Sequence, residues 1–258
     1  MKKISVLILI MAAMFFIVPN LAHGQIPGQH ILIFPQIAFG GEWFTSVLVT
    51  NVTDVPQEFT HGFKAPDGND LYLTITVGND GRQVWGSTYS TNPVPPKGSF
   101  LITLRSSDQK ITTGWMNTWV PVVNGKDALK VQVTYFYAPN GVIEGQASVI
   151  PSEPSRNFSF QAVHSGEFSD TGVAIVNRHN YVPATVKMTV HNMAGAVIAT
   201  VDFTVPVKGQ VAKFVTELVP ALKTGWSGGL VEFSSDQPVS GMSLLMNGGV
   251  FSTGTTFQ

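Results

Sequence analysis

Apolar and polar residues alternate along most of this chain, in short runs bounded by glycine, proline and asparagine. The run from Thr45 to Asn51 reads Thr-x-Val-x-Val-x-Asn, and a period of two places these side chains on one face of a strand. Long stretches with a helical period are missing, and only residues 216–222, with Thr216 as a cap, predict a short helix. The pattern therefore predicts an all-β chain.

The second half of the chain repeats the first. Four pairs of segments match in order: 45–51 with 171–177, 56–68 with 183–195, 94–98 with 205–209, and 113–115 with 224–226. The last two pairs read Val-Pro-x-Lys-Gly and Thr-Gly-Trp, with the same spacing between them in both copies. Matching positions, among them Trp115 and Trp226, are therefore expected to bury matching side chains.

Each copy holds several short predicted strands separated by turn signals, which is typical of immunoglobulin-like and fibronectin-like sandwiches. A hairpin is predicted in both copies, by residues 59–63 with 71–75 and by residues 186–190 with 197–203. We therefore expect two tandem antiparallel immunoglobulin- or fibronectin-like β-sandwich domains.

The first 24 residues have a basic start, an apolar run of about 15 residues and a polar end with small residues, which is the order of a signal peptide. A retained membrane anchor would need about 20 apolar residues, and no later stretch approaches that length. The expected division is 1–24 signal peptide, 25–150 first repeat, 151–155 proline-rich linker, and 156–258 second repeat. Export to the periplasm, the cell surface or the medium follows from this division.

One segment of the first copy has no counterpart. The alignment leaves an insert at about residues 76–92, which contains an Asn-Asp-Gly turn, Arg82, Trp85 and Tyr89. Insertions on a scaffold lie on its surface and often carry function. The alternative is an added edge hairpin whose Trp85 packs on its own sheet.

The charge balance and the lack of cysteine argue against nucleic acid as a partner and against disulfide or thiolate-metal cross-links. Lys and Arg number 15 against 16 Asp and Glu, which is unlike the basic footprint that nucleic-acid backbones require. The chain has no cysteine, so neither disulfides nor thiolate metal sites stabilise it. Its stability must come from apolar burial and sheet hydrogen bonds.

No motif specifies a reaction. The histidines after the signal peptide are not at metal-ligand spacing, and no Gly-x-Ser-x-Gly elbow occurs. His61 is expected to face solvent. The acidic turn at 67–70 has oxygen ligands that calcium could use, although a plain hairpin turn explains it better. We therefore expect no enzyme activity, no catalytic residue, no metal and no cofactor.

Aromatic residues are the better candidates for binding, because exposed rings stack on sugars and buried rings fill cores. Trp43 and Trp85 occur in the first copy only. Together with Arg82 and Tyr89, they are the candidate ligand-binding residues, on an exposed platform of the first repeat.

The order of these motifs resembles a known group of sequences. Residues 34–43 read Phe-Pro-Gln-Ile-Ala-Phe-Gly-Gly-Glu-Trp and precede the Thr-x-Val-x-Val-x-Asn strand, Val-Pro-Pro-Lys-Gly and Thr-Gly-Trp. This is similar to a tandem β-sandwich repeat family of secreted proteins from environmental bacteria, which has no assigned activity. The resemblance implies export and architecture, and it implies no catalytic residue.

Three functions remain open. The first is a secreted, non-enzymatic structural or interaction protein that acts through surface or protein contacts. The second is a carbohydrate-binding module that uses the aromatic residues of the first repeat. The third is a periplasmic two-domain chaperone that lends an edge strand to its clients, although the basic cleft residues of the familiar chaperones are missing here.

Overall fold

The computed structural model describes residues 28–78, 81–91, 93–166, 169–247, 250–253 and 256–257. The predicted signal peptide at 1–24 and the Asn79–Asp80 part of the insert's turn lie outside the described residues. The chain is all-β, with three antiparallel sheets, as the alternation of apolar and polar residues predicted. We refer to residues 28–149 as the first half and to residues 155–257 as the second half.

The first half forms two sheets. The five-stranded sheet has the order β1-β8-β3-β6, with β9 beside β8: β1 (Gln29–Phe39), β8 (Thr112–Val123), β3 (Thr60–Lys64), β6 (Thr88–Ser90), β9 (Lys126–Asp127). The six-stranded sheet has the order β11-β10-β2-β7-β4-β5: β11 (Gly145–Val149), β10 (Leu129–Tyr137), β2 (Trp43–Asn51), β7 (Ser99–Leu104), β4 (Leu73–Val77), β5 (Arg82–Gly86). A one-turn 3-10 helix (Pro139–Gly141) separates β10 from β11. The two sheets enclose one apolar core.

The second half forms one eight-stranded sheet that curls around a core of its own. Its strands are β12 (Ser155–Val163), β13 (Ser169–Val176), β14 (Ala184–His191), β15 (Val197–Val205), β16 (Gln210–Phe214), β17 (Gly228–Asn247), β18 (Val250–Thr253) and β19 (Thr256–Phe257). The long strand β17 runs through the whole of this curled sheet. Its first residues pair with β12 and β14, and its last residues pair with β13 and β18.

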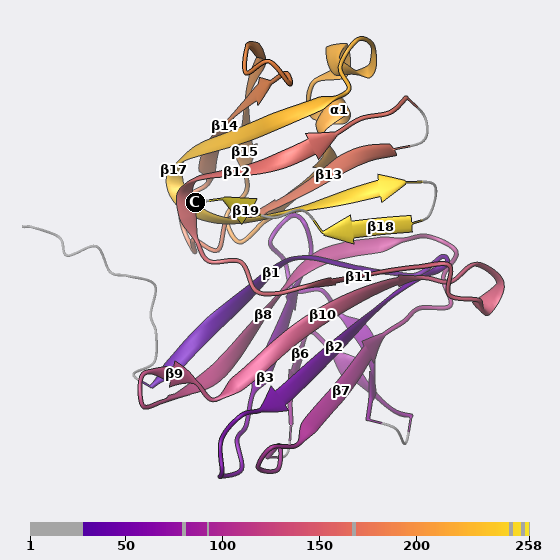
Figure 1. The fold of residues 1–258 in the computed structure, drawn as a ribbon. Coiled ribbons are helices and arrows are strands. Elements are labelled where there is room, and N and C mark those ends of the chain that lie inside the picture. The colour runs from indigo at the N-terminus through magenta and orange to yellow at the C-terminus, as the bar shows by residue number, and fades with distance from the viewer. Residues whose placement is uncertain are drawn as a thin grey trace, which may run out of the picture.

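Both halves use the same order of neighbours (Figure 1). In the first half β8 lies between β1 and β3, and in the second half the first part of β17 lies between β12 and β14. Likewise, β10-β2-β7 in the first half has the order of β17-β13-β16 in the second. The strand that is continuous as β17 is divided into β8 and β10 in the first half.

The halves differ at the insert. The predicted hairpin of the second half forms, since β14 pairs with β15 over its whole length. The predicted hairpin of the first half is wrong: β3 meets the returning chain only at a bridge between Lys64 and Asp70, and β4 pairs with β7 and β5 instead. The insert explains the difference, because its strand β6 occupies the edge of β3 that β15 occupies on β14.

Trp115 and Trp226 are both buried, as expected, but they lie in unlike surroundings. Trp115 packs with Ile33 and Val176 between the halves, and its indole N–H donates to the Lys208 carbonyl at 2.8 Å. Trp226 lies in the core of the second half, and its indole nitrogen has no hydrogen-bond partner among the described residues. The Thr-Gly-Trp motif therefore recurs in sequence without recurring in environment.

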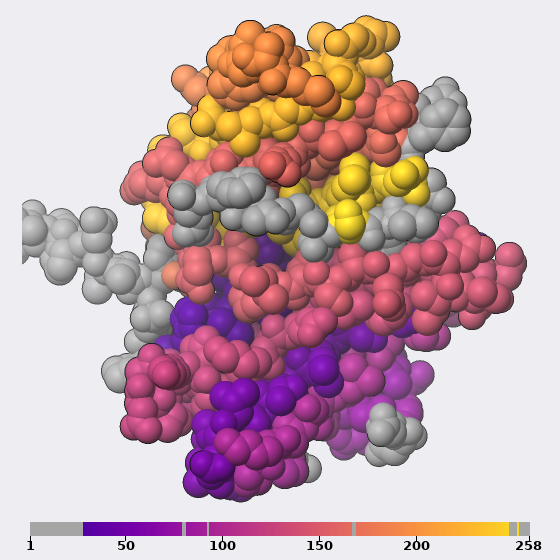
Figure 2. All heavy atoms as spheres, in the orientation of Figure 1, coloured from indigo at the N-terminus to yellow at the C-terminus, as the bar shows by residue number. Residues whose placement is uncertain are grey.

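A turn of the second half docks the two halves together. The amide of Gln210 donates to the Pro66 carbonyl at 2.8 Å, and its side chain donates to the Gly114 carbonyl at 3.1 Å. Gly68 lies so close to the carbonyl of Val207 that a Cβ at this position would overlap it. Figure 2 shows the consequence, since the indigo-to-pink first half and the orange-to-yellow second half pack directly against each other.

Helices are short. The predicted helix at 216–222 is present as α1 (Val215–Leu218) followed by a 3-10 turn (Pro220–Lys223). Thr216 lies within α1 and donates its hydroxyl to Asp170, so its predicted role as the cap is wrong. None of the described helices has the length and apolarity to cross a membrane.

His61 is buried, and the prediction that it faces solvent is wrong. Phe59, His61 and Phe63 are two residues apart, so all three share one face of the chain and point into the core. The His61 ring lies 4.6 Å from that of Phe59, and its Nδ1 bonds the hydroxyl of Thr118 at 2.8 Å. Burial lowers the pKa of His61 to about 3, so the ring is neutral at physiological pH.

Candidate functional site

The insert displays two of the predicted binding residues. Arg82 and Trp85 lie on β5, the edge strand of the six-stranded sheet, and both are exposed. The Trp85 side chain is 69% exposed although it stacks on Tyr72, with 4.9 Å between the ring centroids. Tyr72 is itself 56% exposed. The insert therefore forms an edge hairpin, as the alternative predicted, but Trp85 remains largely exposed on it.

Tyr89 and Trp43 lie elsewhere. Tyr89 is 6% exposed and stacks on Phe100 in the core, so its predicted place on an exposed platform is wrong. Trp43 begins β2 and packs against Tyr137 at the boundary between the two halves. The four predicted residues therefore do not form one site, and Tyr72 is the neighbour of Trp85 that the sequence analysis missed.

The outer face of the six-stranded sheet extends from the Trp85 edge across all six strands. On β2, Val47 and Val49 are fully buried, whereas Leu48 between them is 40% exposed. Residues that pair with outward residues point outward too, so the strand register identifies the whole face. We call this surface the outer face.

One row of hydroxyl and amide side chains crosses the outer face. The paired residues of successive strands in this row are Ser148, Thr134, Ser46, Thr103, Thr76 and Gln83. Neighbours within the row bond one another: the hydroxyls of Thr134 and Ser148 are 2.9 Å apart, and those of Ser46 and Thr103 are 3.4 Å apart. With strands about 4.8 Å apart, the row is roughly 24 Å long.

Apolar groups flank the hydroxyl row on both sides. On one side, the exposed Leu48 and Leu101 are paired. On the other side, the ring of Phe136 stacks on that of Phe44 at 4.5 Å. Phe44 is itself buried, because Phe136 and the guanidinium of Arg105, 3.9 Å from its ring, cover it. The outer face thus combines hydrogen-bonding groups with flat apolar ones.

Charge on the outer face is sparse. Its strand positions carry no carboxylate, and its cations are Lys130 on β10 and Arg105, which directly follows β7 and covers Phe44. The outer face therefore offers mainly hydroxyl and amide groups.

The equivalent face of the second half is covered. Ser46 and Leu48 correspond to Gly172 and Ala174 on β13, 126 residues later. Ala174 is 5% exposed and belongs to the core cluster of the first half, together with Met242. The second half therefore uses this face to dock on the first half, which leaves only the first half's face free.

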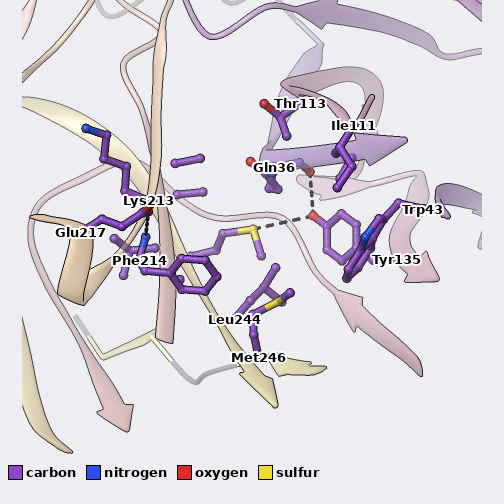
Figure 3. Close-up of a pocket in the computed structure, with 16 residues that line it drawn as sticks. Gln36, Trp43, Ile111, Thr113, Tyr135, Lys213, Phe214, Glu217, Leu244 and Met246 are labelled. Carbon is purple, nitrogen blue, oxygen red and sulfur yellow. Dashed lines mark hydrogen bonds between the residues drawn. The ribbon is translucent and has the colours of Figure 1, made fainter. Parts of the chain in front are cut away.

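A cleft lies where the docking of the two halves is incomplete (Figure 3). Its volume is about 300 Å³. The first half contributes Trp43, Ile111 and Tyr135, and the second contributes the charged residues Lys213 and Glu217 and a wall that is mostly apolar: Val173, Ala174, Ala212, Phe214, Met242, Leu244 and Met246. Burial raises the pKa of Tyr135, so its phenol stays protonated.

Among the described residues, the cluster of Asp170, His164 and Thr216 lacks the order of a catalytic triad. The Asp170 carboxylate accepts the hydroxyl of Thr216 and lies 3.8 Å from Nδ1 of His164. The acid thus stands between hydroxyl and imidazole, whereas nucleophilic catalysis needs the imidazole beside the hydroxyl. The described part of the chain contains no group of three His, Asp or Glu side chains that could hold a metal ion. The Asp67 carboxylate accepts the Asn69 amide at 3.0 Å, as in a plain turn.

Comparison with known proteins adds little. No family model matches the chain, and no curated protein is significantly similar to it. Two solved structures overlap with it weakly: vicilin from hazelnut, Corylus avellana, at 6% identity and a TM-score of 0.25, and the 7S globulin of Momordica charantia, at 8% identity and a TM-score of 0.23. The matches cover 86% and 91% of this chain, and 75% and 82% of those chains. At these scores the likeness carries no argument about function.

Proposed function

We propose that this chain is an exported, non-enzymatic interaction protein that attaches to a carbohydrate surface through the outer face. The observation that carries the proposal is the hydroxyl row with aromatic and aliphatic groups beside it. A sugar ring has the complementary pattern, with hydroxyls around its edge and apolar C–H groups on its faces. Ser, Thr and Gln side chains donate and accept hydrogen bonds, and aromatic rings pack on apolar faces.

The geometry favours an extended ligand over a single sugar. The row spans six strands, and Trp85 with Tyr72 stands at one end of the sheet, on strand β5 and next to β4. A flat surface of this length offers many weak contacts in register, and several weak contacts on one chain add in affinity. The ligand class is therefore an uncharged polysaccharide.

We further propose that each half is one copy of an immunoglobulin- or fibronectin-like sandwich, in the division 25–150 and 156–258. The shared order of neighbouring strands supports this assignment. In this arrangement the second copy is a support that fixes the first, and the first copy carries the contact.

A protein partner is the second candidate. Exposed Trp and Tyr side chains are enriched at the energetic centres of protein interfaces, and Trp85 stacks on Tyr72 beside a free strand edge. The affinity for such a partner would fall when Trp85 or Tyr72 is substituted and would not change when residues of the hydroxyl row are substituted.

The test is sedimentation of the purified chain with insoluble neutral polysaccharides, such as cellulose, chitin and xylan. Thr103→Val removes one hydroxyl from the middle of the row at constant shape and is expected to weaken binding severalfold, because a lost hydrogen bond is worth about 1 kcal/mol. Trp85→Ala is expected to weaken it about tenfold or more.

Matched controls come from the second half. Thr204→Val on the exposed face of β15 and Tyr181→Ala, an exposed ring, make the same chemical changes away from the outer face. They are expected to bind as the unaltered chain does. Equal losses in the controls, or the absence of binding to every polysaccharide, would reject the carbohydrate proposal.

A further inference from the structure

We propose that the cleft between the halves is a second binding site, which takes a small, uncharged, apolar molecule. This site is separate from the outer face, because it is built on the covered face of the second half and on the end of β2. The inference does not depend on the carbohydrate proposal.

The lining determines the chemistry of the ligand. Aliphatic and aromatic side chains of both halves form the walls, and Met242 and Met246 add flexible thioethers that adapt to irregular shapes. Phe214 and Trp43 face the cleft from opposite halves (Figure 3). Pockets with such walls bind ligands by burying apolar surface.

Two polar groups of the cleft, those of Tyr135 and Glu217, are engaged with the protein. The Tyr135 hydroxyl donates to the Gln36 carbonyl at 2.6 Å and lies 3.8 Å from the sulfur of Met242. The Glu217 carboxylate accepts the backbone N–H of Phe214 at 2.7 Å. Water in a cavity needs two to four polar partners, so these walls hold it poorly. The charged residues in the lining, Lys213 and Glu217, both belong to the second half and stand apart from Trp43 and Tyr135 (Figure 3).

The size of the cleft excludes a macromolecule. Its volume of about 300 Å³ is at the small end of the range for ligand pockets. This corresponds to roughly ten molecules of liquid water. One molecule of one or two rings, or a short aliphatic chain, fills it.

The site is fixed by the docking of the halves rather than by a loop. The contacts of Gln210 with Pro66 and Gly114 hold the second half against the start of β8, close to the cleft residue Thr113. A preformed site loses little conformational freedom on binding.

The probe is N-phenyl-1-naphthylamine, an uncharged dye whose fluorescence rises in apolar surroundings. Titrated into the purified full chain, it is expected to show saturable binding of one molecule per chain. Leu244→Trp fills the cleft and is expected to lower the affinity at least tenfold. Leu101→Trp makes the same change on the outer face and is expected to leave the affinity unchanged.

Each outcome of the titration either supports or overturns the proposed site. Saturable binding that only the cleft variant weakens supports the site, whereas no saturable binding, or equal binding in Leu244→Trp and the unaltered chain, overturns it. If circular dichroism shows that Leu244→Trp does not fold, Ile111→Glu replaces it, because Ile111 is 45% exposed at the wall of the cleft and a charge there opposes an apolar ligand. Unchanged affinity in Ile111→Glu would then overturn the proposal.

Discussion

In this protein, the alternation of side chains along a strand decides whether a residue is buried or exposed. His61 and Tyr89 are polar enough to be read as surface residues, yet both share a face with buried neighbours and belong to the core. Trp85 is on the opposite side of its strand from the partly buried Val84 and remains exposed. Residue type alone would therefore place His61 and Tyr89 at the surface. The alternation along the strand places His61 in the core, because Phe59 and Phe63 lie two residues away on either side.

The buried neutral state of His61 makes stability depend on pH. Its pKa is about 3 in the folded chain and 6.5 in the unfolded chain. As the pH falls below 6.5, the unfolded chain gains a proton that the folded chain does not, so the free energy of unfolding decreases until about pH 3. Between pH 7 and pH 5 this loss is about 2 kcal/mol.

Urea unfolding of the unaltered chain and of His61→Phe measures this contribution. The variant removes the titrating group and keeps a ring between Phe59 and Phe63, at the cost of the bond to Thr118. Its free energy of unfolding is expected to fall less between pH 7 and pH 5 than that of the unaltered chain, by about 2 kcal/mol. The same fall in both proteins would mean that His61 is not buried in the neutral form.

At the scale of elements, two turns with the same sequence signal differ in their surroundings: one is open to solvent, and the other contacts the second half. Gly68 and Gly195 occupy matching turns after β3 and β14, and both have positive φ, of 90° and 80°. Around Gly195 the space is open, whereas the backbone of Val207 and Lys208 lies against Gly68. The sequence predicts both turns from Gly alone, but it contains no local signal that one of them is an interface.

Alanine at these two glycines separates turn strain from docking. Gly195→Ala is expected to cost about 1 kcal/mol, because alanine disfavours positive φ. Gly68→Ala carries the same strain and also forces the docked turn apart, so it is expected to lower the thermal midpoint by several degrees more. Scanning calorimetry compares the two, and equal midpoints would show that the Gly68 contact does not hold the halves together.

The insert shows where prediction from the sequence ends. The length difference between the copies predicted an added segment at about residues 76–92, and this range contains β5 with the exposed Trp85. The length difference could not show that β4 pairs with β7 and not with β3. That pairing depends on which strand edges remain unpaired once β6 has paired with β3. The competition between edges is a property of the assembled sheets.

At the scale of the whole molecule, the repeat explains the division of roles. The order β10-β2-β7 in the first half matches the order β17-β13-β16 in the second, so the same face exists twice. In the first half it carries Ser46, Leu48 and Thr50, and in the second it carries Gly172, Ala174 and Val176 at the matching positions. Small and apolar residues permit close docking, which is a sequence signal that the alternation pattern alone overlooks.

The free outer face of the first half, set against the covered face of the second, is the claim on which the carbohydrate proposal depends. Because the chain has no cysteine, Leu48→Cys and Ala174→Cys each place a single thiol at matching positions of the two faces. We expect a maleimide reagent to label the folded Leu48→Cys protein at least a hundredfold faster than Ala174→Cys, and both equally in urea. Similar labelling rates in the folded proteins would contradict the account.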